Sequence, residues 1–282
     1  MSIYKDTQRL EEAIARFRQL GNSIGLVPTM GALHKGHISL VKKALKQNDL
    51  VVVSIFVNPT QFNNKNDLKK YPRTLDKDAK LLKQASNAIL VFAPTANDIY
   101  ESNVKSKKFD FDGLEHEMEG EFRPGHFDGV GTIVKRLLEI VKPDRAYFGE
   151  KDFQQLQIIK KLVTKFNIPV KIIGCAIERE SDGLAMSSRN TRLKKEYRQA
   201  APFIFKTLKS AKEKFGTKSA NEVVKWVYRQ FADHPILKLE YFSIVDTVAL
   251  KPVKRKSNKK TYRAFIAVHA DDVRLIDNIA LN

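Results

Sequence analysis

From residue 24 to residue 177, short apolar runs alternate with segments of helical spacing. The strand-like runs cover residues 24–27, 50–57, 88–93, 145–149 and 170–177. The helical patterns cover residues 36–47, 75–86, 129–141 and 153–166, and Ile38, Val41 and Leu45 share one face of the first helix. Continuously apolar strands that alternate with helices predict an α/β fold, with a parallel sheet covered by helices on both faces.

The order of elements changes after residue 177. Helical patterns cover residues 194–214 and 219–232, and strand-like segments cover 238–246 and 261–270. Helices followed by strands are typical of an α+β unit. We therefore predict a first domain over residues 1–177 and a smaller C-terminal α+β domain over residues 178–282. The amphipathic segment at residues 1–20 predicts an ordinary first helix.

The turn after the first strand-like run holds an unusual set of residues. In VPTMGALHKGH, residues 27–37, Gly31 and Gly36 let the backbone approach a ligand closely. A helix that begins near Gly36 directs unpaired N–H groups and its positive dipole end at the turn, which favours phosphate. His34 and His37 lie three residues apart at this helix entrance. The turn predicts an anion site at the carboxyl end of a strand.

Two other interpretations of the histidine pair stay open at this point. The H-x-x-H spacing is compatible with a metal site, although no third ligand or neighbouring Glu accompanies it. Alternatively, one histidine caps the helix and the other is exposed, without any function. The pair gains significance only from the motifs elsewhere in the chain.

Two later segments also place polar groups after a strand. In YFGEKDFQQLQ, residues 147–157, Lys151 follows a strand, Asp152 suits a helix N-cap and Gln155 lies in the first helical turn. In DGLAMSSRN, residues 182–190, the stretch from Ser187 to Asn190 is rich in hydrogen-bond donors that suit a triphosphate. Alone, the first segment is a common charged turn and the second is a polar linker.

Composition and charge narrow the class of protein. The chain has 282 residues, of which 43% are hydrophobic, and its one cysteine, Cys175, excludes an intramolecular disulfide and suits a reducing cytoplasm. No apolar run approaches the roughly 20 residues that span a bilayer, and no signal peptide is expected. The net charge of +18 raises the possibility of nucleic-acid binding. The densest basic run, residues 251–260, has no interleaved aromatic residues and is interpreted as a solvated hairpin loop.

Taken together, the segments resemble a known enzyme family. GALHKGH is similar to the H-I-G-H element of class I aminoacyl-tRNA synthetases and related nucleotidyltransferases, and MSSRN is similar to their K-M-S-K-S loop. Six motifs occur in the order found in the pantothenate synthetase (pantoate–β-alanine ligase) family, followed by RLIDN at 274–278. The six motifs are PTMGALHKGH, SIFVNPTQF, YPRTLDKD, RPGHFDGVGTIV, FGEKDFQQL and DGLAMSSRN. The resemblance implies a Rossmann-like N-terminal domain, a smaller C-terminal domain and a cytoplasmic homodimer.

The resemblance also implies the reaction. The family condenses (R)-pantoate with β-alanine in an ATP-dependent reaction that passes through a pantoyl-adenylate and releases pyrophosphate and AMP. Mg²⁺ on the phosphates would assist as a Lewis acid. The alternatives are another carboxylate-adenylating nucleotidyltransferase or, less expected, a nucleic-acid-binding protein. No membrane partner is expected.

Site residues follow from the resemblance by matching motif positions. His34, His37, Lys151 and Arg189 are the expected catalytic residues, since they are donors that stabilise charge on the phosphates. His37 matches a proton donor of the family, but its chemistry supports phosphate stabilisation more directly. The expected ATP-binding residues are Met30, Gly31, Ala32, Leu33, His34, Lys35, Gly36, His37, Gly149, Glu150, Lys151, Asp152, Met186, Ser187, Ser188 and Arg189. The expected pantoate and β-alanine residues are Gln61, Gln155, Asn58 and Arg123.

Two positions carry further expectations. Asp78 is a candidate ligand of Mg²⁺, and no other protein ligand for the metal is expected. Glu178 stands where the family more often has an apolar residue beside the adenine, which puts the pocket wall in question more than ATP binding itself.

Overall fold

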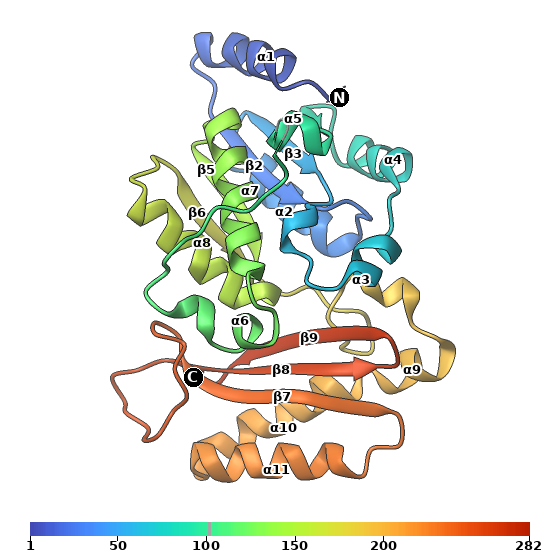
Figure 1. Ribbon diagram of the computed structural model, residues 1–282, viewed down its shortest axis with the longest axis vertical. Helices are drawn as coiled ribbons and strands as arrows, with labels where there is room; N and C mark the ends of the chain where they lie inside the picture. The colour runs from blue at the N-terminus through green and yellow to red at the C-terminus, as the bar shows by residue number, and fades with distance from the viewer. Residues whose placement is uncertain (101–102) are drawn as a thin grey trace. The chain divides into compact units, whose positions relative to one another are not determined.

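The computed structural model describes residues 1–100 and 103–282 (Figure 1). The chain divides into two compact units. The first unit comprises Met1–Glu150 and Gln155–Ala176, and the second comprises Lys151–Gln154 and Ile177–Asn282. No helix among the described residues is both long enough and apolar enough to cross a membrane.

The first unit is built on a six-stranded parallel sheet, as the alternating apolar runs predict. Its strand order is β1-β4-β3-β2-β5-β6. Strand β1 is a three-residue edge strand, too short to show a period in the sequence, and it was not predicted. The strands are β1 (Ser2–Tyr4), β2 (Ile24–Thr29), β3 (Leu50–Ile55), β4 (Ile89–Phe92), β5 (Arg145–Gly149) and β6 (Lys171–Cys175).

Helices cover both faces of this sheet, which confirms the predicted arrangement. Val41 of α2 and Leu82 of α4 pack with Val51 of β3 on one face. On the other face α7 contacts β2, and Leu156 of α8 lies against Gly174 of β6. The helices of this unit are α1 (Thr7–Gln19), α2 (Lys35–Leu45), α3 (Lys65–Lys70), α4 (Leu75–Ala85), α5 (Ala96–Tyr100), α6 (Glu119–Phe122), α7 (His126–Val141) and most of α8 (Phe153–Lys165), with short 3₁₀ turns η1 (Pro59–Gln61) and η2 (Leu114–His116). The turn η3 (Glu150–Asp152) and the start of α8 include the segment Lys151–Gln154 of the second unit.

The strand order reverses beside β2. The chain moves from β2 outward to β3 and β4, and β5 then pairs with the opposite side of β2, with Leu26 opposite Ala146. In parallel sheets of this kind, ligands bind beyond the carboxyl ends of the strands at such a reversal. Thr29 ends β2 and Gly149 ends β5, so the predicted anion site begins at this position.

The second unit packs two long helices against a three-stranded antiparallel sheet (Figure 1). Its core joins Leu208 of α10 and Val227 of α11 to Ile266 of β8. The elements are η4 (Ser188–Arg192), α9 (Lys195–Ala200), α10 (Phe203–Thr217), α11 (Ala220–Ala232), β7 (Leu237–Asp246), β8 (Tyr262–Ala270) and β9 (Val273–Ala280). This unit confirms the predicted α+β character of the C-terminal region.

Two details of the second unit differ from the predictions. The single helix predicted over 194–214 is wrong, because it is interrupted between Ala200 and Phe203, where Pro202 has no N–H to continue the helix. Strand β9 was not predicted, because its residues were interpreted only as part of a motif. The basic run at 251–260 lies between β7 and β8, whose antiparallel pairing of Asp246 with Tyr262 confirms the hairpin loop.

Candidate active site

The loop after β2 is held by a buried carboxylate. Gly31 (φ +79°) and Ala32 (φ +49°) both adopt left-handed backbone conformations, which turn the chain sharply after the strand. Asp78 of α4 is 2% exposed, and its carboxylate accepts hydrogen bonds from Ala32 N (2.9 Å) and Leu33 N (2.8 Å). A Cβ at position 31 would lie 3.1 Å from Asp78 Oδ2. Asp78 therefore fixes the backbone of this loop, and the left-handed φ together with this close approach favours glycine at position 31.

The two histidines that follow form a reciprocal cap on α2. His34 is the N-cap, and its Nδ1 accepts from Gly36 N at 3.1 Å. His37 Nδ1 accepts from His34 N at 3.3 Å, and the ring centroids lie 4.1 Å apart. A nitrogen that accepts a hydrogen bond carries no proton, so the proton of each neutral imidazole is on Nε2. The cap thus presents two Nε2–H donors at the positive end of a helix.

The structure can be compared with the two other interpretations of the H-x-x-H spacing, which are a metal site and a cap formed by one histidine alone. Within residues 1–100 and 103–282, no group of three or more His, Cys, Asp and Glu side chains is placed to hold a metal ion. Both histidines, rather than one, take part in the cap, and both side chains are only partly exposed. The pair is therefore a single structural unit with a defined tautomer.

The predicted substrate residues Asn58 and Gln61 interact directly in η1. Asn58 is 1% exposed, and its Nδ2 donates to Gln61 Oε1 and to Gly129 O, both at 3.1 Å. Its Oδ1 accepts from the hydroxyls of Thr60 and Tyr100. Burial raises the pKa of Tyr100, although hydrogen bonds with Thr60 and Asn58 act in the opposite direction. The Tyr100 hydroxyl therefore remains a donor that fixes the Asn58 amide.

Gln61 is held at both ends. Its Nε2 donates to Met30 Sδ at 3.2 Å, which connects it to the loop after β2. The main-chain carbonyl oxygen of Gln61 accepts a hydrogen bond from Arg123 Nη2 at 3.2 Å and another from His126 Nδ1 at 2.9 Å. Because Nδ1 must donate to a carbonyl, His126 Nε2 is the acceptor for Arg123 Nη1 at 3.3 Å. Arg123 thus holds the backbone of Gln61, and so does His126, which was not among the predicted site residues.

A close approach between helix and turn sets this arrangement. Gly129 of α7 lies so near η1 that a Cβ would come within 2.5 Å of Thr60 O and 2.7 Å of Gln61 Cα. Only glycine allows α7 to pack directly on the turn. The motif RPGHFDGVG therefore supplies the supports of Gln61: Arg123, His126 and Gly129.

The remaining predicted residues of the first unit lie around the end of β5. Gly149 ends that strand, and Glu150 follows it in η3. A Cβ on Gly174 would lie 3.4 Å from Glu150 Oε1, so Glu150 packs against the neighbouring strand β6. Gln155 lies in the first turn of α8 with a partly exposed side chain.

In the second unit, Lys151 is anchored through its backbone. Asn278 Nδ2 of β9 donates to Lys151 O at 2.8 Å. The Lys151 ammonium lies 3.8 Å from Asp152 Oδ2, and its side chain is 19% exposed. The Arg263 guanidinium lies over the Phe153 ring, 4.0 Å from the ring centroid. The short segment Lys151–Gln154 is therefore attached to the sheet of this unit.

The MSSRN segment follows a compact hairpin. Arg179 and Ala185 form an antiparallel bridge, and Met186 N donates to Glu178 O at 3.0 Å. Ser187 is the N-cap of η4, where its Oγ accepts from Arg189 N at 3.2 Å. Glu178 has an exposed side chain and contributes only its carbonyl to the hairpin. The hydrogen bond of the hairpin at position 178 therefore uses a main-chain atom and does not depend on the side chain there.

A buried ion pair ties this hairpin to β9. Arg179 Nη1 and Nη2 donate to the two carboxylate oxygens of Asp277 at 2.6 and 3.0 Å. The guanidinium also stacks on Phe205, 3.6 Å from the ring centroid. Burial raises the pKa of Asp277, whereas the hydrogen bonds and charge of Arg179 lower it. Neither Arg179 nor Asp277 was predicted as a site residue. Asp277 lies in the RLIDN motif, and Arg179 lies shortly before the DGLAMSSRN motif.

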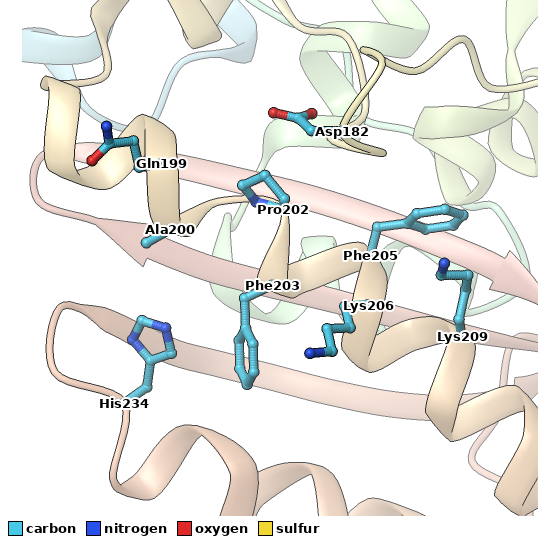
Figure 2. Close-up of a pocket in the computed structure, with 9 residues that line it drawn as sticks. All are labelled: Asp182, Gln199, Ala200, Pro202, Phe203, Phe205, Lys206, Lys209 and His234. Atoms are coloured by element: carbon cyan, nitrogen blue, oxygen red, sulfur yellow. The ribbon is translucent and has the colours of Figure 1, made fainter.

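A separate cavity of about 430 Å³ opens in the second unit beside the start of α10 (Figure 2). Phe203 and His234 lie side by side in it, with ring centroids 4.8 Å apart, while Lys206 and Lys209 project from α10. None of the predicted site residues lines this cavity. Its lining is Asp182, Gln199, Ala200, Pro202, Phe203, Phe205, Lys206, Lys209 and His234.

Comparison with known protein sequences gives a consistent result. A family model described as pantoate-beta-alanine ligase matches residues 2–280. The chain is 57% identical over 282 residues to a pantothenate synthetase of Christiangramia forsetii, with complete coverage of both chains. It is also 57% identical over 281 residues to a pantothenate synthetase of Flavobacterium psychrophilum, again with complete coverage.

Solved structures agree over the same length. A pantothenate synthetase from Thermus thermophilus is 37% identical, with a TM-score of 0.91 that covers 100% of this chain and 99% of the other. A pantoate-beta-alanine ligase from Francisella tularensis, complexed with beta-gamma ATP and beta-alanine, is also 37% identical, with a TM-score of 0.81 and coverage of 100% and 98%.

Proposed function

The chain belongs to the pantoate-beta-alanine ligase family, and from this membership we propose how its residues carry out the reaction. The enzyme is a ligase that joins pantoate to β-alanine to form pantothenate. We propose that ATP supplies the activation. The pantoate carboxylate attacks the α-phosphorus of ATP, forms a pantoyl-adenylate and releases pyrophosphate. The amine of β-alanine then attacks the acyl carbon, and AMP leaves with the electron pair of the cleaved acyl–oxygen bond.

In the first unit, His34 and His37 bind the phosphates of ATP. Their Nδ1 atoms accept backbone N–H groups, so Nε2–H is the donor of each neutral ring, and we assign this donor to a phosphate oxygen. A carboxylate nucleophile is already ionised, and the first step therefore needs alignment and charge stabilisation more than a base. This favours phosphate stabilisation over proton transfer as the role of His37.

Gln61 orients pantoate through its amide. One Nε2 hydrogen is directed to Met30 Sδ, while Asn58 holds the amide oxygen. The second Nε2 hydrogen is the one we assign to a substrate oxygen. A neutral amide fixes the orientation of a carboxylate without the strong ion pair that would lower its reactivity. We assign Gln155 to the same substrate and Asn58 and Arg123 to the support of Gln61.

In the second unit, Lys151 and Arg189 supply positive charge for the triphosphate. Arg189 lies in the short turn η4, whose N-cap is Ser187. Arginine suits phosphate because its planar donors match phosphate oxygens in pairs. Lysine acts on phosphate as a point charge.

The role of Mg²⁺ is assigned to the substrate rather than to a protein site. Both carboxylate oxygens of Asp78 accept backbone N–H groups of the loop after β2. That use does not fit a metal ligand, so we assign Asp78 to the loop. The metal would arrive with the phosphates of ATP, and no step of the proposal depends on a protein ligand for it.

Two parts of the proposal rest on the family alone. We propose that the enzyme is a homodimer and that it acts in the cytoplasm. Size-exclusion chromatography coupled to light scattering tests the first part, with about twice the 32.2 kDa chain mass expected. A particle of one chain mass at micromolar concentration would contradict it.

One observation carries the proposed role of the first unit in adenylation: the reciprocal His34–His37 cap, which engages the Nδ1 atoms of both rings, at the strand-order reversal. The test is isotope exchange between pyrophosphate and ATP in the presence of pantoate alone. Exchange is expected, because the first step is reversible and does not need β-alanine. Formation of AMP is expected only when ATP, pantoate and β-alanine are all present.

Control acids make the test specific. Other small hydroxy acids, supplied at equal concentration, are expected to support little exchange. Exchange with such acids but not with pantoate would contradict the assignment of Gln61 and Gln155. Complete absence of pantoate-dependent exchange in protein that still forms pantothenate would contradict the adenylate intermediate.

A further inference from the structure

We propose that Asp277 and Asn278, neighbours in β9, are positioning residues that hold the two ATP-binding segments of the second unit in a fixed mutual arrangement. One segment is Lys151–Gln154, and the other is the hairpin that leads into Met186–Arg189. The inference rests on the proposed binding of ATP by these segments. It adds a specific means by which segments distant in sequence are aligned.

We use the word tie for a side-chain contact that joins two segments distant in sequence. The first tie runs from Asn278 to Lys151. The Asn278 side chain is 1% exposed, and its Nδ2 donates to Lys151 O across 127 positions of sequence. Its Oδ1 accepts from Arg263 Nη1, whose guanidinium lies over Phe153. Because both ends of the amide are engaged, the amide cannot rotate without losing a buried hydrogen bond. Asn278 therefore sets the backbone position of Lys151.

The second tie runs from Asp277 to the hairpin. Asp277 is 4% exposed, and Arg179 meets both of its oxygens. The same guanidinium donates to Gly183 O at 3.1 Å, within the turn of the hairpin. A two-pronged pair of this kind fixes orientation as well as distance. Asp277 therefore sets the position of the strand pair that ends in Met186.

The two ties share one rigid base. Residues Val273–Ala280 of β9 pair continuously with β8. Asn278 N also donates to Asp277 Oδ1 at 2.7 Å, so the two side chains are linked locally. Successive residues of a strand point to opposite faces, which lets one reach the hairpin and the other reach Lys151. Displacement of a binding group by about 1 Å can reduce turnover roughly 10²-fold, so a rigid base of this kind has functional value.

The experiment compares substitutions at the two ties with a matched control in the same three-stranded sheet. Asn278→Asp is nearly isosteric and keeps the acceptor for Arg263 but removes the donor to Lys151. Asn278→Ala removes both contacts, and Asp277→Asn weakens the pair with Arg179. The control is Glu240→Gln, which removes the charge that pairs with Arg274 of β9 but touches neither segment. Steady-state constants are measured for all three substrates, with thermal unfolding of each variant.

Asn278→Asp and Asn278→Ala are expected to raise KM for ATP and lower kcat, with a combined loss in kcat/KM for ATP of roughly ten- to a hundredfold. The KM values for pantoate and β-alanine should stay within twofold of the wild-type values. Asp277→Asn should show the same pattern, and Glu240→Gln should leave all constants near wild type. A purely structural role predicts something different: a lower melting temperature and a lower active fraction, with unchanged KM values.

Three outcomes overturn the inference. They are unchanged KM for ATP in folded Asn278→Asp and Asn278→Ala proteins, parallel changes in KM for all three substrates, or the same KM effect in Glu240→Gln. If Asp277→Asn fails to fold, the Asn278 variants still decide the matter. Failure of the proposed function is recognised separately, because wild-type enzyme would then show no pantoate-dependent exchange at all.

Discussion

Each unit fixes a predicted ATP-binding segment with a buried aspartate, but the two aspartates have different partners. Asp78 of the first unit accepts backbone N–H groups of Ala32 and Leu33. Asp277 of the second unit pairs with the side chain of Arg179. The segment after β2 is thus held directly by its backbone, whereas the hairpin before Met186 is held through a guanidinium.

The difference reflects how each segment is attached to its unit. The loop after β2 is short, since it continues a central strand and leads at once into α2. Two hydrogen bonds are sufficient to fix so few residues. The hairpin over residues 178–186 is not part of a sheet of three or more strands, so it needs a long side chain that reaches a strand far away in sequence. The backbone tie should therefore matter more for stability, and the side-chain tie more for alignment.

The strongest test of the comparison removes one donor from each unit. His37→Ala and Lys151→Ala should each reduce turnover roughly 10²-fold or more, because each removes a group that stabilises charge on the phosphates. Initial rates of AMP formation give the loss, and circular dichroism checks that folding is intact. Near-native turnover in either variant would show that its unit does not contribute the assigned donor.

The next effect concerns the backbone tie. Asp78→Ala should lower the free energy of unfolding by about 2–4 kcal/mol, because two partly buried N–H groups lose a buried acceptor. Asp78→Asn should lose less, since its amide oxygen still accepts one of them. Urea denaturation measures both, with Asp76→Ala as an exposed control in the same helix. A loss no larger than that of the control would mean that the loop does not depend on Asp78.

A smaller effect should separate pantoate binding from ATP binding. Tyr100→Phe removes the hydroxyl that donates to Asn58, and with it about 1 kcal/mol of orientation for the Gln61 amide. We expect KM for pantoate to rise several-fold, with KM for ATP unchanged. This is the opposite of the pattern expected for Asn278→Asp. A rise in KM for ATP instead would break the distinction between the two sets of ties.

The smallest effect is a pH dependence in the second unit. Burial alone would raise the pKa of Glu240, but hydrogen bonds and charge from Arg274 and His269 outweigh it, and the pKa lies below its ordinary value. A carboxylate of this kind stabilises the fold above its unfolded pKa, roughly 4.3, and loses that contribution as the pH falls through the lower folded value. The difference in melting temperature between wild type and Glu240→Gln should therefore shrink below about pH 4. A difference that stays constant from pH 7 to pH 3 would contradict this expectation.

Local patterns in the chain were sufficient for most of the fold. The apolar runs located β2 to β6, because a strand buried on both faces is apolar along its whole length. Helical spacing located α2, α4, α7 and α8, but not the shorter helices α3, α5 and α6. The motifs also located the histidine cap and the amide of Gln61. Both are short-range features, since His34 and His37 interact across three positions, as do Asn58 and Gln61.

The supports of the site were decided only by tertiary structure. The residues that support the site contact partners far away in sequence. His126 and Gln61 are 65 positions apart, Arg179 and Asp277 are 98 apart, and Asn278 and Lys151 are 127 apart. The sequence around each residue does not predict its partner. Asp78 illustrates the limit well, because the family resemblance suggested a metal ligand whereas its partners are backbone N–H groups. A periodic pattern records which face of an element is buried, but a hydrogen bond depends on where two folded elements come together. That information exists only after the chain has packed.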